Sequence, residues 1–298
     1  MAVLLTGSSG LLGTALTPLL TAAGHTVIPL RRRSSAPAPG EAVWDAEAGT
    51  IDLTQSGPLS AVVHLAGESV GQRWSAASKR RMWDSRCRGT ELLCAALNRM
   101  AEPPHTLVCA SATGFYGDRG EEWLEERSAA GTGFLADLTT AWEKASAQAI
   151  ARGIRVVHLR FGIVLAPRGG ALARMLPIFR AGLGGRLGNG RQYWSWVSLE
   201  DSLRAVLHVL SERSLDGPVN VTSPCPVTNA EFTRVLGQEL HRPAVLATPR
   251  FFVELAFGEM GREALLSSAR VRPARLAAAG FSFRQTELSE ALRALVGG

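Results

Sequence analysis

The chain has 298 residues and a formal net charge of +6, so it can form one large α/β domain with a smaller appendage and bury a sizeable core. Lys79 and Lys144 are its only lysines among 32 basic residues, which indicates a compositional bias toward arginine. Because most of the arginines are scattered, nucleic-acid binding is a minor alternative that only the basic charge supports.

The cysteines and the N-terminus narrow the class of protein further. Cys87, Cys94, Cys109 and Cys225 show neither CxxC spacing nor a histidine cluster, so neither a zinc site nor a disulfide framework is expected. Cys94 and Cys109 stand in apolar sequence and are expected in the core. The chain begins directly with a strand pattern and has no apolar run of membrane-spanning length. We therefore expect a soluble, cytoplasmic protein that needs no metal.

The strongest motif lies at the start of the chain. An apolar run over residues 2–5 is followed by Gly7, Gly10 and Gly13, and a second apolar run covers residues 27–30. This order predicts strand, glycine turn, helix and strand, which is the opening βαβ unit of a dinucleotide-binding domain. In such a unit the exposed amides at the start of the helix face the pyrophosphate of the nucleotide.

The residues after the second strand indicate which nucleotide is bound. An NAD enzyme usually has Asp or Glu there for the ribose 2′-hydroxyl, whereas a 2′-phosphate needs cations. This chain has Arg31, Arg32 and Arg33 and no carboxylate before Glu41. A solvated basic turn is the alternative for at least one of the three, but guanidinium groups match a phosphate well, so we expect NADP(H).

Further strand-like and helical patterns alternate along the first half of the chain. This alternation predicts an α/β fold, a Rossmann-like, doubly wound parallel sheet. A short strand is also expected at residues 43–45. The strand-like runs cover residues 27–30, 61–65, 106–109 and 155–159, and the helical patterns cover residues 76–100 and 134–152.

The pattern changes after residue 160, where many glycines interrupt short apolar pieces. We expect residues 1–160 to form the nucleotide-binding domain, with parts of 161–247 adding to its sheet. Residues 161–247 are expected to form a substrate-facing lobe, with helices at 199–212 and 229–240, and residues 248–298 a small helical C-terminal domain. Thr228 is expected to cap the helix at 229–240, with Glu231 completing a capping box. The C-terminal substrate lobe as a whole is thus expected to be smaller and mostly helical.

Several segments together resemble the extended short-chain dehydrogenase/reductases. They are the glycine turn, His64-Leu65-Ala66-Gly67, Ala110-Ser111-Ala112 and Phe115-Tyr116-Gly117. The segments at 159–165, 184–192, 195–197 and 227–232 are similar to the NAD-dependent epimerase/dehydratase-like subgroup, and the tail from Thr248 is similar to that subgroup's C-terminal domain of unknown function. The resemblance covers essentially the whole chain.

The resemblance is weakest at the catalytic positions. Active short-chain dehydrogenases carry Tyr-x-x-x-Lys on the helix after the fifth strand, and here the matching positions fall near Phe134 and Leu138, which cannot move a proton. Ser111 occupies the place of the family's catalytic serine or threonine, or is a strand-end serine that bonds nearby backbone. Tyr116 is the nearest remaining phenol and is therefore the candidate for the catalytic acid. Its alternative role is to pack around the nicotinamide pocket. Lys144 lies beyond the expected lysine and is expected at the surface.

The resemblance also implies which residues contact the nucleotide and which contact the substrate. Two of the implied nucleotide contacts have alternatives: Arg86 can be a surface cation, and His64 can be a structural histidine. Gln192, Trp194 and Trp196 can form an aromatic and polar surface for a planar or sugar-like ligand, but the two tryptophans can equally pack between the lobes. The implied nucleotide contacts are Gly7, Ser8, Ser9, Gly10, Leu11, Leu12, Gly13, Arg31, Arg32, His64, Leu65, Ala66, Gly67, Ser85 and Arg86.

Three functions fit these features. The first is an NADP(H)-dependent oxidoreductase or epimerase that acts on a small molecule, with Ser111 positioning an oxygen. The second is a catalytically silent NADP(H)-binding sensor or regulator, which Phe134 and Leu138 favour. The third is an NADP-scaffolded structural or nucleic-acid-associated protein. The resemblance further implies a homodimer, because extended members of the superfamily are commonly dimers.

Overall fold

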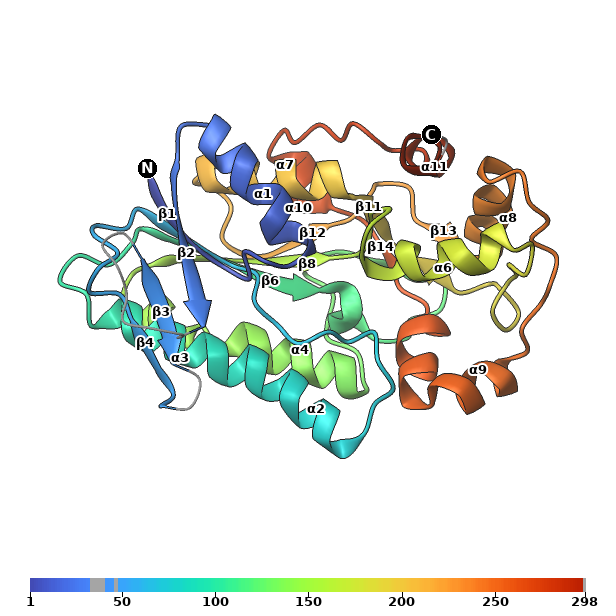
Figure 1. Ribbon diagram of the computed structural model, residues 1–298, viewed down its shortest axis with the longest axis horizontal. Helices are drawn as coiled ribbons and strands as arrows, with labels where there is room; N and C mark the ends of the chain where they lie inside the picture. Colours follow the sequence, from blue (N-terminus) through green and yellow to red (C-terminus); the bar gives the residue numbers. More distant parts are fainter. Residues whose placement is uncertain (33–40, 46–47, 297–298) are drawn as a thin grey trace.

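An eight-stranded sheet forms the centre of the molecule (Figure 1). The computed structural model describes residues 1–32, 41–45 and 48–296, without the side chain of Arg32. Neighbouring strands run parallel except for the antiparallel pair β3 and β4 at one edge. The order across the sheet is β12 (Gly217–Val221), β8 (Arg155–Phe161), β6 (Thr106–Ala112), β5 (Ala61–His64), β1 (Ala2–Thr6), β2 (Thr26–Arg32), β3 (Ala42–Asp45) and β4 (Thr50–Asp52).

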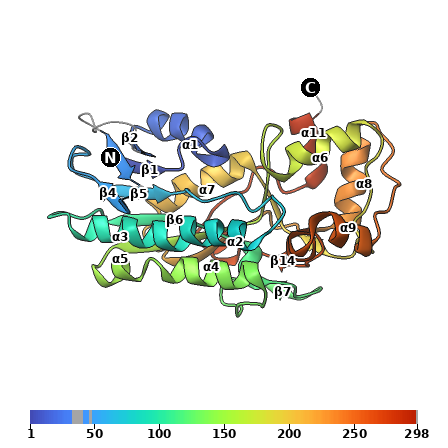
Figure 2. The same ribbon diagram turned by 60° about the horizontal axis from the view of Figure 1, so that its bottom comes forward.

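Helices cover both faces of this sheet, so the expected doubly wound α/β fold is confirmed (Figures 1 and 2). Helices α1 (Leu11–Ala22) and α7 (Leu199–Ser211) lie on one face, and α3 (Gly89–Asn98) lies on the other. Alternate residues of a strand point to opposite faces, so Val3 packs in the cluster with α1 and α7 whereas Leu4 packs in the cluster with α3.

The long helical pattern after β5 is interrupted by a different helix type. Helix α2 (Ala76–Trp83) passes into a π-helical segment, η1 (Asp84–Arg88), and then into α3. Ser75 and Ser78 form a reciprocal capping box at the start of α2. Single π-helical turns often occur at functional sites. The pattern at 134–152 is likewise divided, into α4 (Phe134–Lys144) and α5 (Ala147–Ala151).

The glycine-rich second half is more regular than its sequence suggests. Helix α6 (Gly170–Arg180) was not expected, because two glycines begin it and Pro177 lies inside it. Thr228 caps α8 (Asn229–Glu239), as expected, by accepting a hydrogen bond from the Glu231 amide at 3.2 Å. Short strands connect these helices, namely β9 (Ile163–Leu165), β10 (Tyr193–Trp194), β11 (Trp196–Ser198) and β13 (Val227–Thr228).

The last fifty residues wrap back onto both parts of the molecule. Strand β14 (Arg270–Val271) pairs with β7 (Trp123–Leu124) beside the sheet, and α11 (Leu288–Val296) packs in the core of the second lobe. The other helices of this tail are α9 (Arg250–Phe257), η3 (Gly261–Leu265) and α10 (Ala274–Ala278).

Cys94 and Cys109 are buried, as expected. The described residues contain no group of three His, Cys, Asp or Glu side chains that could hold a metal ion. Among residues 1–32, 41–45 and 48–296 we find no helix with the length and apolarity needed to cross a bilayer.

Candidate functional site

The glycine turn between β1 and α1 has the geometry that a dinucleotide-binding unit requires. Gly7 adopts φ 69°, and a Cβ there would lie 2.8 Å from the backbone nitrogen of Ala66. A Cβ on Gly13 would lie 2.2 Å from the Gly7 carbonyl oxygen. Both positions therefore need glycine for close packing inside the protein. A Cβ on Gly10 would meet only the Gly7 oxygen, at 3.3 Å, so Gly10 instead keeps the outer side of the turn open.

The N-terminus of α1 lacks the features that usually neutralise a helix start. Its N-cap is Gly10, no side chain caps it, and its first turn contains no acidic residue. Ser9 and Gly10 are exposed, while Ser8, Leu11 and Leu12 are half-buried. Ser75, Ser198 and Thr228 cap α2, α7 and α8 with their hydroxyl groups, whereas α6 and α9 share the uncapped, acid-free start of α1. The amides at the start of α1 are thus available to an anion.

The end of β5 is fixed beside this turn by a buried hydrogen-bond chain. The amides of Leu65 and Ala66 donate to Thr6 Oγ1 at 3.1 and 3.2 Å, so the Thr6 hydroxyl donates to His64 Nδ1 at 2.7 Å. His64 Nε2 then donates to Thr90 Oγ1 at 3.0 Å. Burial, together with the charge of Arg86, lowers the pKa of His64 to about 4. His64 is therefore a neutral residue that holds two strand ends together.

Ser85 and Arg86 of the π-helical segment hold the loop that follows β5. The Glu68 amide donates to Ser85 Oγ at 3.0 Å, and Arg86 Nη1 donates to the Glu68 carbonyl oxygen at 2.8 Å. A Cβ on Gly67 would lie 3.2 Å from the Arg86 guanidinium carbon. Burial lowers the pKa of Arg86 to about 10. The structure thus shows these two residues fixing the loop that follows β5, next to the glycine turn.

The expected phosphate-binding arginines are only partly described. Arg31 is exposed at the carboxyl end of β2, one residue beyond Leu30, which pairs with Thr6 of β1. The backbone of Arg32 ends the strand, and Arg33 lies outside the described residues. Arg31 therefore stands at the same sheet edge as the glycine turn, because parallel strands end together.

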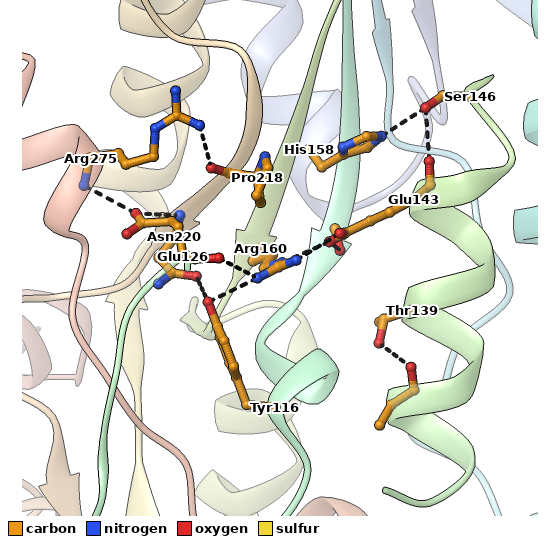
Figure 3. Close-up of polar contacts among 12 residues, drawn as sticks. Tyr116, Glu126, Thr139, Glu143, Ser146, His158, Arg160, Pro218, Asn220 and Arg275 are labelled. Atoms are coloured by element: carbon orange, nitrogen blue, oxygen red, sulfur yellow. Dashed lines mark hydrogen bonds and ion pairs between the residues drawn. The ribbon is translucent and has the colours of Figure 1, made fainter. Parts of the chain in front are cut away.

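Ser111 is held by a buried ion pair at the end of β6. Its hydroxyl donates to Glu143 Oε1 at 2.7 Å. Arg160, its register partner on β8, donates from Nε and Nη2 to the two Glu143 oxygens, both at 2.8 Å (Figure 3). Burial alone would lower the pKa of Arg160, but the bonds and charge of Glu143 outweigh it and raise that pKa. The Ser111 hydrogen is thus committed to Glu143, which leaves the oxygen as an acceptor.

Tyr116 lies at the end of η2 (Thr113–Tyr116) on the other side of the Arg160 guanidinium (Figure 3). Its hydroxyl accepts from Arg160 Nη1 at 3.1 Å and donates to Asn220 Oδ1 at 2.7 Å. The side chain is fully buried, and burial raises its pKa. In this arrangement the phenol is a member of an internal network rather than a group open to a ligand.

This internal network continues toward the C-terminal domain. Asn220 Nδ2 donates to the Arg272 carbonyl oxygen at 3.0 Å, and the amides of Asn220 and Arg275 donate to Glu126 Oε1 at 3.0 and 3.2 Å. Glu126 Oε2 is buried without a partner among the described residues. Side chains around Ser111 are therefore connected to the backbone of the tail.

The positions at which the resemblance predicts the Tyr-x-x-x-Lys pair lie on α4. Phe134 is its first residue, and Leu138 is buried in the core. Lys144 is exposed, as expected. Both oxygens of Glu263 accept hydrogen bonds from the first amides of α4, at 3.0 Å from Phe134 and 2.9 Å from Leu135. A carboxylate of the C-terminal domain thus occupies the start of this helix.

The expected aromatic surface lies inside the second lobe. Gln192, Trp194 and Trp196 are 6%, 6% and 0% exposed. Gln192 Nε2 and Trp194 Nε1 donate to the Leu265 carbonyl oxygen, and Trp196 Nε1 donates to Cys225. Because these polar atoms already have backbone partners, the structure favours packing, the alternative that the sequence left open, over direct contact with a ligand.

Sequence reasoning missed the residues that hold Ser111. The motifs single out neither Glu143 nor Arg160, and they do not single out Glu126 or Glu263 of the C-terminal contacts either. Arg160 offered a signal, since it stands in an apolar strand run. An arginine buried in a central strand needs a carboxylate partner.

Comparisons with known proteins place this geometry in a family. The profile of the NAD dependent epimerase/dehydratase family matches residues 3–221, and a domain of unknown function, DUF1731, matches residues 248–295. The chain belongs to the NAD dependent epimerase/dehydratase family. Its match to the second profile agrees with the resemblance of the tail.

Relatives match over nearly the full length. Epimerase family protein Mb2239 of Mycobacterium bovis is 47% identical, over 97% of this chain and 96% of that protein. A crystal structure of human epimerase family protein SDR39U1 with NADPH has a TM-score of 0.89 at 34% identity, covering 100% and 99% of the two chains. A nucleoside-diphosphate sugar epimerase from Corynebacterium glutamicum has a TM-score of 0.80 at 33% identity, and this chain covers 58% of its length.

Proposed function

We propose that this protein binds NADP(H) across the turn between β1 and α1. The carrying observation is the open, uncapped and acid-free start of α1, whose amides suit a pyrophosphate. Arg31 is suited to the ribose 2′-phosphate, because it is the last residue but one of β2, beside the turn, and is exposed. The crystal structure of the human relative SDR39U1 with NADPH supports the same choice of nucleotide.

The proposed contacts around this turn divide into two groups. The first group supports the proposed nucleotide site, called the nucleotide crevice below, through contacts inside the protein. The glycines of this group allow close packing and its side chains form internal hydrogen bonds; its members are Gly7, Gly13, His64, Ser85 and Arg86. The proposed direct contacts are the exposed or half-buried Ser8, Ser9, Gly10, Leu11, Leu12, Arg31, Leu65, Ala66 and Gly67, together with the backbone of Arg32.

The proposed activity is that of an oxidoreductase or epimerase for a small, sugar-like substrate. Bound NADP(H) supplies hydride transfer. Ser111 orients the substrate as a hydrogen-bond acceptor, because its own hydrogen is held by Glu143. Its partner is therefore a hydroxyl group of the substrate rather than a carbonyl oxygen. Tyr116 enters this proposal as a positioning residue, because its hydroxyl accepts from Arg160, which holds Glu143. Gln192, Trp194 and Trp196 enter it as packing residues of the second lobe.

The second candidate is a catalytically silent NADP(H)-binding sensor. One observation favours it: neither Phe134 nor Leu138 can exchange a proton, and the buried Tyr116 hydroxyl is already bonded to Arg160 and Asn220. The capping of α4 by Glu263 further links this region to the C-terminal domain rather than to a ligand.

Calorimetric titration with NADPH and NADH tests the shared part of both candidates. NADPH should bind more tightly, and Arg31→Ala should weaken NADPH about tenfold or more while leaving NADH unchanged. Arg152→Ala, which removes an equally exposed arginine elsewhere, is the matched control. Equal affinity for the two nucleotides, or no binding, would overturn the proposal.

A second measurement separates the enzyme from the sensor. The NADPH-loaded protein is mixed with a panel of hydroxyaldehydes, hydroxyketones and keto sugars, whose hydroxyl groups can donate to Ser111, and the loss of nicotinamide absorbance is followed. Turnover that Ser111→Ala abolishes supports the enzyme. Nucleotide binding without turnover across the panel supports the sensor.

A further inference from the structure

A hollow of about 800 Å³ lies on the side of α8, in the second lobe. One wall is a single face of the helix, since Ala230, Thr233, Arg234, Gly237 and Gln238 follow the spacing i, i+3, i+4, i+7, i+8. The facing wall is the chain that returns after the helix, residues 241–247, and Arg186 completes the lining.

The two walls are joined by a fixed turn. His241 adopts the left-handed conformation, φ 53°, and reverses the chain at the end of α8. The Arg242 amide then donates to the Gly237 carbonyl oxygen at 2.9 Å. A Cβ on Gly237 would lie 2.6 Å from the Ala244 Cβ, so glycine is required for this close approach. The hollow is thus a built feature of the lobe.

Its charged lining consists of arginines. Arg186, Arg234 and Arg242 line it together with the polar residues His241, Thr233 and Gln238, and no Asp or Glu does. Arg234 Nη1 is held by Gln238 Oε1 at 2.8 Å, and Arg242 Nε donates to the Arg180 carbonyl oxygen at 3.0 Å. These bonds orient two guanidinium groups at the hollow without neutralising either charge.

Some arginines of the same half of the chain have a carboxylate partner, whereas others, such as Arg174 and Arg180, form no ion pair within the described residues. Arg191 pairs with Glu121 at 3.1 Å, Arg250 with Glu254 at 2.6 Å and Arg293 with Glu239 at 3.1 Å. Within the described part of the chain, none of the three arginines of the hollow forms an ion pair. Like charges that share a hollow without a counter-charge repel, and a bound anion relieves that repulsion.

We propose that this hollow binds the phosphate group of a small organic ligand. Guanidinium groups form two parallel hydrogen bonds with phosphate oxygens, which suits a site of three arginines. Ala244, Val245 and Ala247 in the same lining provide an apolar surface for the body of the ligand. The site goes beyond the proposed nucleotide site, since none of the residues that line the hollow is among the proposed nucleotide contacts. Helix α8, which forms one wall, is drawn to the right of α1 in Figures 1 and 2.

Calorimetric titration with inorganic pyrophosphate tests this proposal on protein that is first saturated with NADPH, so that the nucleotide crevice is filled. One saturable event is expected at low salt. Arg234→Ala and Arg242→Ala should each weaken it about tenfold to a hundredfold. Arg213→Ala, an exposed arginine after α7, is the matched control and should leave the affinity unchanged. Thermal melts of all variants check that each is folded.

Two results would overturn the proposal: the absence of a saturable event in the folded wild-type protein, or an equal loss of affinity in Arg213→Ala. If NADPH does not bind in the first step, the proposed function is wrong. The phosphate site is still tested in that case, because the pyrophosphate affinities of Arg234→Ala and Arg213→Ala can be compared. The failures of the two proposals are therefore distinguishable.

Discussion

Glu263 of the C-terminal tail caps helix α4 of the nucleotide-binding half, with its two carboxylate oxygens 3.0 and 2.9 Å from the amides of Phe134 and Leu135. These residues are separated by about 130 positions in the chain, so the contact is made only after the tail has docked. Lys79 and Glu259 form an ion pair at 2.8 Å between the same two parts of the protein. The tail therefore supplies contacts that hold the start of α4 and the neighbouring helix α2.

Removal of this cap should loosen α4 at its start. Glu263→Ala leaves two helix amides without partners and should lower the free energy of unfolding by about 0.5–2 kcal/mol. Hydrogen exchange at Phe134 and Leu135 should become faster. The control is Glu259→Ala, which removes the partly exposed ion pair with Lys79 and should cost at most about 1 kcal/mol. Unchanged exchange at Phe134 and Leu135 in Glu263→Ala would show that the cap does not hold the helix.

The buried ion pair between Glu143 and Arg160, which holds Ser111, gives a second prediction. Arg160 is 3% exposed and Glu143 13% exposed, so removing either partner leaves a poorly solvated charge. Glu143→Leu or Arg160→Met alone should lower the free energy of unfolding by about 3–5 kcal/mol. The double variant should lose clearly less than the sum of the two, since it leaves no unpaired charge. Urea denaturation of the three variants measures this coupling, and simple additivity would argue against the pair.

The sequence predicts local features of this site well. Gly7, Gly10 and Gly13 encode the turn within seven residues, and Thr228 encodes the cap of α8 three residues before its amide partner. In both cases the residue and the backbone group that it affects lie within a few positions of each other in the chain. The parallel α/β class of the fold follows similarly, because buried strands and helices alternate along the chain.

Long-range partners could not be predicted in this way. Ser111 and Glu143 are separated by 32 positions, and only the docking of α4 against β6 brings them together. The second lobe shows the same limit. From the sequence, Trp194 and Trp196 fit ligand binding and packing equally well, and only the structure shows that their ring nitrogens donate to backbone oxygens. Helix α6 was missed because its glycines and Pro177 have low helix propensity, which tertiary packing overrides.

His64 should make the protein less stable as the pH falls. In the unfolded chain a histidine takes up its proton near pH 6.5, whereas native His64 remains neutral until the pH reaches about 4. The unfolded state thus binds more protons, and up to about 3 kcal/mol of stability is lost between pH 6.5 and pH 4. His158, whose pKa burial also lowers, adds to this loss.

Urea unfolding of the wild type and His64→Gln from pH 7 to pH 4.5 measures this effect. The variant should be less stable at pH 7 and should lose less stability on acidification. His105→Gln, which removes an exposed imidazole, should keep the wild-type slope. Parallel pH profiles for wild type and His64→Gln would contradict the assignment of a neutral, buried His64.

Two glycines of the turn should respond differently to the same substitution. A Cβ on Gly13 would lie 2.2 Å from the Gly7 carbonyl oxygen, so Gly13→Ala should lower the thermal midpoint strongly. A Cβ on Gly10 lies 3.3 Å from that oxygen and otherwise faces the open side of the turn. Gly10→Ala should therefore stay folded with nearly the wild-type midpoint, and yet weaken NADPH about tenfold or more, because the methyl group occupies the approach of the pyrophosphate to the amides of α1. Differential scanning calorimetry and NADPH titration of both variants measure the two effects separately. Wild-type NADPH affinity in a folded Gly10→Ala protein would show that the nucleotide does not lie on this turn.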